Sequence, residues 1–204
     1  MAMPTLLTMR NAIKVGTRLY LRPLEVEDAP LFARASAFET ETAHDFRVPT
    51  SELAFVHWIT EMSRAHPPTE ITFAVCERGS DRLLGGVTIR HLDWVNRVGE
   101  TGSGLLDAAD RGQGYGSEAK HLLLDYCFND LHLHAVNAGV FAPNTRSAAA
   151  LRKQGYRLAG RLRWDEFKDG AWHDALIFDL LREDWLALRS AADQAGEGDG
   201  EGIG

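Results

Sequence analysis

The sequence predicts an α+β domain built on a mixed, mostly antiparallel sheet, and three observations support this fold class. The length of 204 residues suits one domain with short appendages. Segments with strand patterns follow one another in the middle and at the end of the chain, separated by short turns. Segments with helical periodicity precede and interrupt them, so helices are expected to flank the sheet.

The N-terminal third is expected to form one strand, two helices and a polar connection. TRLYLRPL at 17–24 alternates in polarity and ends at a proline, which suits the end of a strand. Acidic residues and a proline then open a helical pattern that ends near Phe38. After the polar residues 40–50, a second helix should run from Ser51 to about Arg64, because two prolines follow.

The rest of the chain contains apolar runs, each flanked by turn-forming residues, and two segments with a helical pattern. In chain order we expect strands at 71–77, 82–92 and 97–106, a helix at 117–130, a strand at 134–141, a helix from Asn144 to Gln154, and strands at 156–167 and 171–181. The last two strands should form a hairpin, because a Lys-Asp-Gly turn joins them.

Composition predicts the domain boundaries. Residues 1–16 are expected to be an N-terminal extension, 17–189 the folded domain, and 190–204 a disordered tail. The tail is rich in glycine and carries four acids and no base, which accounts for −4 of the formal net charge of −7. An acidic chain is a poor electrostatic partner for nucleic acid, so we expect no nucleic-acid binding.

The cysteines and the apolar stretches indicate the cellular compartment in which the protein is expected. Cys76 and Cys127 each lie in an apolar run without a CxxC partner, which favours buried, unreactive thiols over a metal or redox site. The first residues lack the apolar core of a signal peptide, and no window approaches about 18 consecutive apolar residues. We therefore expect a cytoplasmic protein without membrane contact.

The most informative run extends from Leu105 to Ala119, where three alternating glycines separate a strand from an amphipathic helix. Glycines let successive backbone N–H groups point into one concavity, and the helix N-terminus adds a partial positive charge. This combination favours phosphate binding, with a ligand-free glycine turn as the alternative. A Walker P-loop is excluded because no lysine follows Gly116, and a Rossmann fingerprint because Ser117 replaces its third glycine.

The run from Arg111 to Gly116, RGQGYG, fits the pattern Gln/Arg-x-x-Gly-x-Gly/Ala, which is the pyrophosphate loop of the GNAT N-acetyltransferase superfamily. Further matching pieces occur in the right order: LYLRPLEVEDA near the start, the run from Asn144 to Tyr156, AGRLRWDEF at 159–167, and DLLREDW at 179–185. The chain therefore resembles this superfamily over 17–185. It is most similar to the Rim-type branch of ribosomal-protein N-terminal acetyltransferases.

The resemblance implies a GNAT fold whose sheet is splayed at the coenzyme site, with acetyl-CoA as co-substrate and no metal. It places the pyrophosphate on the loop backbone, the pantetheine arm along the preceding strand, and the pantetheine amides near Asn144. The implied coenzyme-binding residues are Leu105, Leu106, Arg111, Gly112, Gln113, Gly114, Tyr115, Gly116, Ser117 and Asn144. For Asn144, a plain helix N-cap is the alternative.

Several bases accompany this run in an otherwise acidic chain. One of them is expected to meet a phosphate of the coenzyme, whereas each one alone is interpreted as a solvated side chain. The set comprises Arg111, Lys120, Arg146, Arg152 and Lys153.

In the family's reaction a neutral amine attacks the acetyl thioester directly, so a proton must leave the nitrogen and a thiolate must leave the carbon. The family spacing, counted from Ser147, implies that Glu166 is the general base, and Ser147 then faces the sulfur. Aromatic neighbours in WDEF are expected to give Glu166 apolar surroundings. The alternatives are a strand-surface carboxylate for Glu166 and a first-turn helix residue for Ser147.

The strand before the loop departs from the family pattern. Relatives read Glu-x-Gly-Tyr-Trp-Leu where this chain reads ETGSGLL from Glu100, so Ser103 and Gly104 replace an aromatic pair. This change should open space near the acyl group or the acceptor, and it makes Glu100 a second candidate base. Val140 stands where some relatives have a cysteine, which argues against an acyl-cysteine mechanism.

The resemblance implies an N-acetyltransferase that acts on a primary amine. The acceptor is a small-molecule amine or a protein N-terminus, and the sequence does not decide between them. Transfer of another acyl group, such as succinyl, and a non-catalytic CoA-binding sensor are the alternatives. The connection at 40–50 shapes the acceptor pocket in the family, which makes His44 a candidate contact. By analogy with relatives, the protein would be a homodimer.

Overall fold

The computed structural model describes residues 9–38, 51–168 and 170–198. The strands are β1 (Lys14–Val15), β2 (Leu19–Pro23), β3 (Ile71–Glu77), β4 (Leu83–Asp93), β5 (Val98–Leu105), β6 (Ala135–Phe141), β7 (Arg157–Lys168) and β8 (Ala171–Leu181). The α-helices are α1 (Ala29–Phe38), α2 (Glu52–Arg64), α3 (Tyr115–Asp125), α4 (Thr145–Lys153) and α5 (Arg182–Gly198). Short 3-10 turns precede α1 and α3, and a π-helical turn at Tyr126–Asp130 extends α3.

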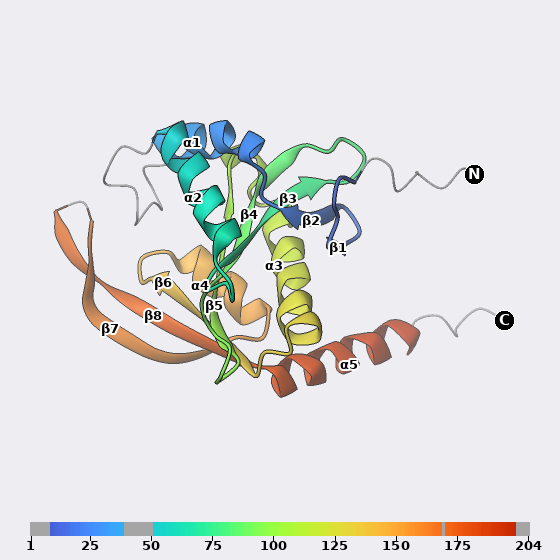
Figure 1. The fold of residues 1–204 in the computed structure, drawn as a ribbon. Coiled ribbons are helices and arrows are strands. Elements are labelled where there is room, and N and C mark those ends of the chain that lie inside the picture. The colour runs from blue at the N-terminus through green and yellow to red at the C-terminus, as the bar shows by residue number, and fades with distance from the viewer. Residues whose placement is uncertain (1–8, 39–50, 169, 199–204) are drawn as a thin grey trace, which may run out of the picture.

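The strands form one mixed sheet in the order β1-β2-β3-β4-β5-β6-β8-β7 (Figure 1). Every neighbouring pair is antiparallel except β5 and β6, which run parallel. A parallel pair needs a long crossover, and α3 supplies it between these two strands. The predicted α+β class, with a mostly antiparallel sheet, is confirmed.

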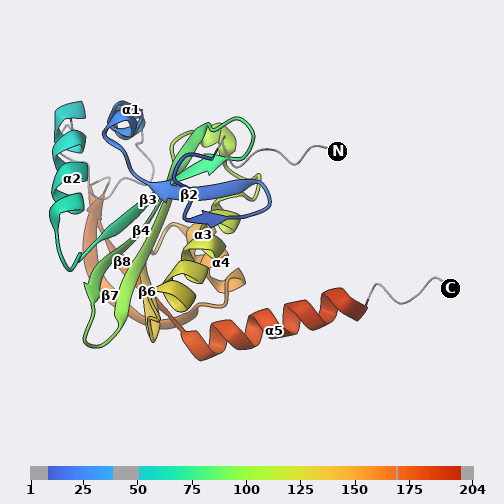
Figure 2. The same cartoon turned by 45° about the vertical axis from the view of Figure 1, so that its right-hand side comes forward.

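Helices cover both faces of the sheet (Figure 2). Phe55 and Ile59 of α2 pack with Tyr20 on one face, where α1 also lies. The larger core forms on the other face, where α3 and α4 pack against residues that include Leu19 and Leu21. Successive residues of β2 thus enter opposite cores, because side chains alternate across a strand. The two cores hold the sheet rigidly between the helices.

β5 and β6 separate before either strand ends. Their pairing joins only Val98–Glu100 to Ala135–Asn137, although β5 continues to Leu105 and β6 to Phe141. β4 remains paired with β5 along this part, and β8 remains paired with β6. The sheet therefore opens between β5 and β6 alone, which confirms the splaying that the resemblance implies.

The structure differs from the expected boundaries at both ends of the chain. Lys14–Val15 pair with β2, so this part of the expected N-terminal extension belongs to the sheet. Helix α5 includes 190–198, the first part of the segment that was expected to be disordered. Residues 199–204, and the connection at 40–50 with its candidate contact His44, lie outside the described residues.

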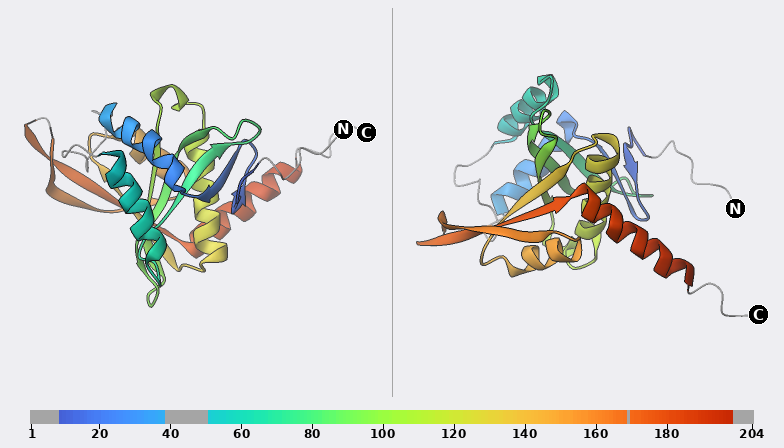
Figure 3. Two further views of the ribbon diagram at one scale, coloured as in Figure 1. Left: turned by 45° about the horizontal axis from the view of Figure 1, so that its top comes forward. Right: turned by 90° about the horizontal axis from the view of Figure 1, so that it is seen from below.

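Helix α5 begins directly after β8 ends. Because no turn separates the two, the strand pattern gave no sign in the sequence that a helix follows. Glu183 and Asp184 in its first turn suit the positive end of the helix dipole. Trp185 is buried and its ring packs on Phe128, with ring centroids 5.2 Å apart. Figure 3 shows that α5 and the β7–β8 hairpin project from the body in opposite directions. No helix among the described residues is long and apolar enough to cross a membrane.

Candidate active site

A glycine loop leads from β5 into α3. Gly112 and Gly114 have φ values of 78° and 83°, in the left-handed region that favours glycine. Gly114 is the N-cap residue of α3 and contributes no side-chain cap. The first N–H groups of a helix have no partner within the helix, and the helix dipole makes this end positive. The loop is therefore suited to hold an anion.

Arg18, immediately before β2, fixes the position of this loop. Its guanidinium donates to the carbonyl oxygen of Gln113 at 2.9 Å and to Glu118 at 3.0 Å, and it lies over the ring of Tyr115. Glu118 also accepts hydrogen bonds from the backbone N–H groups of Arg18 and Leu19. Burial alone would raise the pKa of Glu118, but these hydrogen bonds outweigh burial and lower it. No motif in the sequence predicted this anchor.

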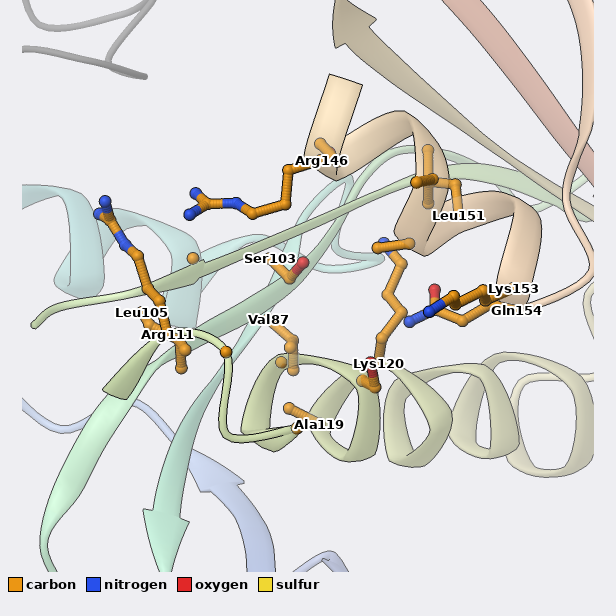
Figure 4. Close-up of a pocket in the computed structure, with 18 of the residues that line it drawn as sticks. Val87, Ser103, Leu105, Arg111, Ala119, Lys120, Arg146, Leu151, Lys153 and Gln154 are labelled. Atoms are coloured by element: carbon orange, nitrogen blue, oxygen red, sulfur yellow. The ribbon is translucent and has the colours of Figure 1, made fainter. Parts of the chain in front are cut away.

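A pocket of about 600 Å³ lies between the loop, β5, α3 and α4 (Figure 4). Arg111 and Arg146 stand at one end of it, and Lys153 lines it from α4. A Cβ built on Gly112 or Gly116 would meet no atom within 4 Å, so protein atoms do not fill the space beside these glycines. We call this space the coenzyme pocket.

The coenzyme pocket fits the group that the resemblance implies. Arg111, Arg146 and Lys153 suit phosphates, and the loop and helix N-terminus suit a pyrophosphate. Gln154 also lines this pocket, and its side-chain Oε1 is buried without a hydrogen-bond partner among the described residues. A buried acceptor of this kind is normally paired, and a donor on a ligand would pair it.

A second space, of about 210 Å³, lies in the opening between β5 and β6, and we call it the splay chamber. Gly102 and Gly139 line it without side chains, and Phe141 and Arg90 also face it. The chamber meets the coenzyme pocket, because five residues line both: Ser103, Lys120, Asn144, Ser147 and Leu151. A ligand that fills the coenzyme pocket can therefore extend a group into the chamber.

Asn144 and Ser147 meet at the start of α4. The Asn144 Oδ1 atom accepts a hydrogen bond of 3.0 Å from the backbone N–H of Ser147, so Asn144 is the helix N-cap. A coenzyme contact by Asn144 would therefore use its Nδ2 donor. Ser147 occupies the first turn of α4 and lines both spaces, which places this residue at their junction.

Glu100 is the last residue that pairs β5 with β6, and it lies beside the splay chamber without lining it. Its Oε1 accepts hydrogen bonds from Arg90 Nε at 2.9 Å and Nη2 at 2.5 Å, and its Oε2 lies 3.1 Å from His91 Nδ1. The same Oε1 lies 3.9 Å from the position that a Cβ on Gly139 would take. The carboxylate is thus beside the chamber wall, with both oxygens engaged.

Glu166 lies on the projecting hairpin, opposite His173 across the β7–β8 pair, and it lines neither the coenzyme pocket nor the chamber. The pairing register shifts between Leu162 and Glu166, and Trp164 within this irregularity has a φ of 54°. Such a bulge turns neighbouring side chains away from regular alternation. Trp164 is 74% exposed, whereas the Oε2 atom of Glu166 is buried, so the apolar surroundings expected for Glu166 stay a prediction.

Lys120 differs most from the sequence-based interpretation, which placed it in solvent. It is only 3% exposed and lines both the coenzyme pocket and the chamber. On α3 and its π-helical extension it shares a face with the buried Leu124 and Cys127, four and seven residues later. That spacing was the signal that could have identified it.

Most of the predicted coenzyme-binding residues come together in this structure. Those that line the coenzyme pocket are Leu105, Arg111, Gly112, Gly114, Gly116, Ser117 and Asn144. Leu106, Gln113 and Tyr115 do not line it. The side chain of Gln113 donates back to the Ala109 carbonyl, and the Tyr115 hydroxyl donates to Glu77, so a coenzyme contact by either would use the backbone.

Of the predicted bases, Arg111, Lys120, Arg146 and Lys153 line the coenzyme pocket, whereas the guanidinium of Arg152 stacks over the ring of Phe178. Cys76 and Cys127 are buried, as expected. In the part of the chain that the structure describes, no group of three or more His, Cys, Asp or Glu residues is placed to hold a metal ion.

Comparison with known proteins agrees with this geometry. Residues 18–157 match the family described as Acetyltransferase (GNAT) domain. The chain is 29% identical over 177 residues to the probable N-acetyltransferase YjcK of Bacillus subtilis (strain 168), across 83% of this chain and 97% of that protein. It is also 29% identical over 103 residues to the putative ribosomal N-acetyltransferase YdaF of the same organism, across 50% of this chain and 56% of that protein.

Solved structures share the fold. The spermidine N-acetyltransferase of Vibrio cholerae, solved in complex with CoA and spermine, has a TM-score of 0.76 and 22% sequence identity, across 84% of this chain and 99% of that chain. The family match covers most of the described domain, and it includes the glycine loop and the splayed strands. The chain therefore belongs to the GNAT acetyltransferase family and is an acyl-CoA-dependent N-acetyltransferase.

Proposed function

We propose that this protein transfers an acetyl group from acetyl-CoA to the primary amine of a small molecule, by direct attack of the amine on the thioester. One observation carries the proposal: the coenzyme pocket continues, through five shared residues, into the splay chamber. A thioester at this junction would lie between a site for the coenzyme and a space for the acceptor. Direct transfer needs the two reactants held side by side in this way.

In this proposal the loop and the basic residues hold the coenzyme. Backbone N–H groups of 112–117 bind the pyrophosphate, and Arg111 and Arg146 pair with phosphate charge. The backbone of β5 beyond Glu100, where pairing with β6 has ended, accepts the pantetheine arm. When bound, acetyl-CoA supplies an activated acyl group, and the chain orients that group toward the chamber.

The residues at the junction assist the exchange of sulfur for nitrogen. Ser147 donates a hydrogen bond to the departing sulfur, and the residue supports this role because it lines both spaces. The proton that the acceptor nitrogen loses passes to a carboxylate. Neither Glu100 nor Glu166 lines the two spaces, but the geometry favours Glu100, because its Oε1 lies 3.9 Å from the position of a Cβ on Gly139 in the chamber wall.

Two relatives suggest where the search for the acceptor should begin. One structural relative is solved with spermine, and YdaF is described as a ribosomal acetyltransferase, although it aligns with only half of this chain. Polyamines and N-terminal peptides are therefore the first members of an acceptor panel. Activity on a peptide N-terminus would support the narrower Rim-type assignment, whereas we expect activity on a small amine. The homodimer stays a prediction, and sedimentation velocity of the purified protein would test it.

The test is thiol release from acetyl-CoA in the presence of each amine, with mass spectrometry of the products. We expect release only when a suitable amine is present, with one acetylated amine formed for each thiol. The matched control is a variant of the glycine loop, Gly116→Glu, because this variant should not bind the coenzyme. Tight coenzyme binding without turnover on any amine would instead indicate a sensor and overturn the proposal.

A larger acyl group is the second candidate, because the chamber walls at Gly102 and Gly139 carry no side chains. Ser103, which also lines the chamber, stands where relatives carry a bulky residue. The two candidates are separated by kcat/KM for acetyl-CoA and succinyl-CoA with one acceptor. We expect acetyl-CoA to be the better substrate, and the opposite order would assign the succinyl reaction.

A further inference from the structure

Lys120 is a buried cation at the one place where the coenzyme pocket and the splay chamber share lining residues. It is 3% exposed and lies in the second turn of α3, and its side chain extends from this helix toward α4 (Figure 4). Burying a lysine is costly, so proteins seldom place one inside without a role. Neither the coenzyme-binding loop nor the candidate bases explain this position.

Groups from several elements act on the charge of Lys120. Cys127 follows on the same helical face, Arg90 and Glu100 lie on β4 and β5, and the Tyr156 ring lies 5.8 Å from the Nζ atom. The pKa of Lys120 is lowered to about 7, and burial is the largest cause; Cys127 and Glu100 raise it, and Arg90 lowers it. From α4, Lys153 and Gln154 line the same pocket.

The other buried groups near this junction are poor acids at neutral pH. Burial raises the pKa of Cys127 to about 12, and it raises the pKa of Tyr156 beyond its ordinary range. The Tyr156 hydroxyl is also engaged with Thr101, at 2.7 Å. The Ser147 hydroxyl can donate a hydrogen bond, but a serine does not give up its proton at neutral pH.

We propose that Lys120 is a further catalytic residue, whose ammonium group gives its proton to the coenzyme sulfur as the thioester breaks. This inference rests on the proposed acetyl transfer. As the acceptor nitrogen bonds to the carbonyl carbon, the carbon–sulfur bond breaks and its electron pair stays on sulfur. The sulfur takes a proton from Lys120 Nζ and leaves as a thiol. The nitrogen releases its own proton to a base, and solvent returns a proton to Lys120.

The acidity of Lys120 suits this transfer. An ordinary thiol has a pKa of about 8.5, which exceeds the value of about 7 for Lys120. The proton therefore moves from the stronger acid to the weaker one. General acids work best when their pKa lies near the operating pH, and Lys120 meets this condition because it is buried. Ser147 retains its role in orienting the sulfur.

The test compares Lys120→Met and Lys120→Arg with the wild type at saturating acceptor. With acetyl-CoA, both variants should lose about 10²-fold or more in kcat, because neither side chain can release a proton at neutral pH. The kcat of the wild type should fall as the pH rises above about 7, and this falling limb should be absent in both variants. If Lys120→Arg retains wild-type kcat, only the positive charge matters and the proton-donor role is wrong.

A change of leaving group separates proton donation from a structural role. An acetyl thioester of an acidic aryl thiol breaks without protonation, so the ratio of wild-type to Lys120→Met rates should approach one with this donor. An unchanged ratio would overturn the inference. Lys153→Met is the matched control, because Lys153 lines the coenzyme pocket and not the chamber. It should raise KM for the coenzyme and leave the ratio between the two donors as in the wild type.

Separate control measurements distinguish a loss of folding and a failure of the proposed function from a failure of this inference. Lys120→Met removes a desolvated charge, so its melting temperature should equal or exceed that of the wild type, and Lys120→Gln serves if the Met variant does not fold. If the wild type releases no thiol with any amine, the proposed function fails. If the wild type is active and Lys120→Met matches its kcat and its pH profile, this inference alone fails.

Discussion

Glu100 and Glu166 differ in their surroundings, and at the scale of single residues this difference predicts which carboxylate takes the proton of the acceptor. Neither carboxylate lines the two spaces, but Glu100 lies beside Gly139 in the chamber wall, whereas Glu166 lies on the projecting hairpin. The spacing from Ser147 could not reveal this, because a bulge interrupts β7 before Glu166. We therefore expect the two residues to respond differently to the same change.

Glu100→Gln should lower kcat by about 10²-fold at neutral pH, since glutamine keeps the shape but accepts no proton. Raising the pH toward the pKa of the acceptor should bring the kcat of the variant closer to that of the wild type at the same pH, because free amine then forms without help. Glu166→Gln should remain near the wild type across this range.

The measurement is kcat against pH for both variants. Because Glu100→Gln also removes the ion pair with Arg90, melting curves and coenzyme affinity serve as controls for folding and binding. The reverse result, a slow and pH-rescued Glu166→Gln beside a normal Glu100→Gln, would move the base to Glu166. If neither variant is slow, the acceptor arrives already deprotonated and positioning accounts for catalysis.

At the scale of elements, the decisive feature is the junction of the glycine loop with α3. The left-handed glycines end the loop, the helix begins at once, and Arg18 with Glu118 ties this corner to the strand before it. The site is therefore preorganised, because the N–H groups that would hold an anion belong to a rigid helix start.

Gly116→Glu should abolish coenzyme binding without unfolding the protein. A glutamate suits the first turn of a helix, and Gly116 has open space around its missing side chain, so folding should be retained. Its carboxylate would repel the pyrophosphate. Coenzyme A at a hundred times its Kd should stabilise the wild type by about 2.7 kcal/mol and the variant not at all.

The measurement is the thermal shift with coenzyme A, and Gly116→Ala is the control that adds a side chain without charge. The alanine variant should keep most of the shift. A full shift in Gly116→Glu would place the coenzyme elsewhere.

At the scale of the whole molecule, α5 shows how the C-terminal segment divides into a packed part and an exposed part. Trp185 is buried against Phe128, and Leu188 lies close enough to Gly155 that a Cβ there would stand 2.2 Å from it. Residues 189–191 are exposed. The contacts described for this helix thus come from residues before 190.

A chain that ends at Ser190 should keep its melting temperature and its coenzyme affinity. Trp185→Ala should cost about 3–5 kcal/mol of folding free energy, because it empties a large buried site. Thermal and chemical denaturation of both variants measure this contrast. A loss of several degrees on truncation would show that the segment after 190 packs on the domain.

The amino-acid sequence by itself determined the features that depend on local chemistry. Alternating polarity predicted the strands, and the glycines before α3 predicted the anion-binding loop, because the backbone angles of Gly112 and Gly114 are a local requirement. Asn144 could be recognised as an N-cap for the same reason, since its hydrogen bond spans only three residues.

Only the tertiary structure decided which side chains meet at the junction. Lys120 is buried because α3 packs its face against strands that are distant in sequence, and Glu100 lies beside the chamber because β5 and β6 separate just beyond it. Glu166 has the expected spacing from Ser147, yet it lies on the hairpin and lines neither space. Spacing along a chain describes one element, whereas burial and proximity depend on how several elements pack together.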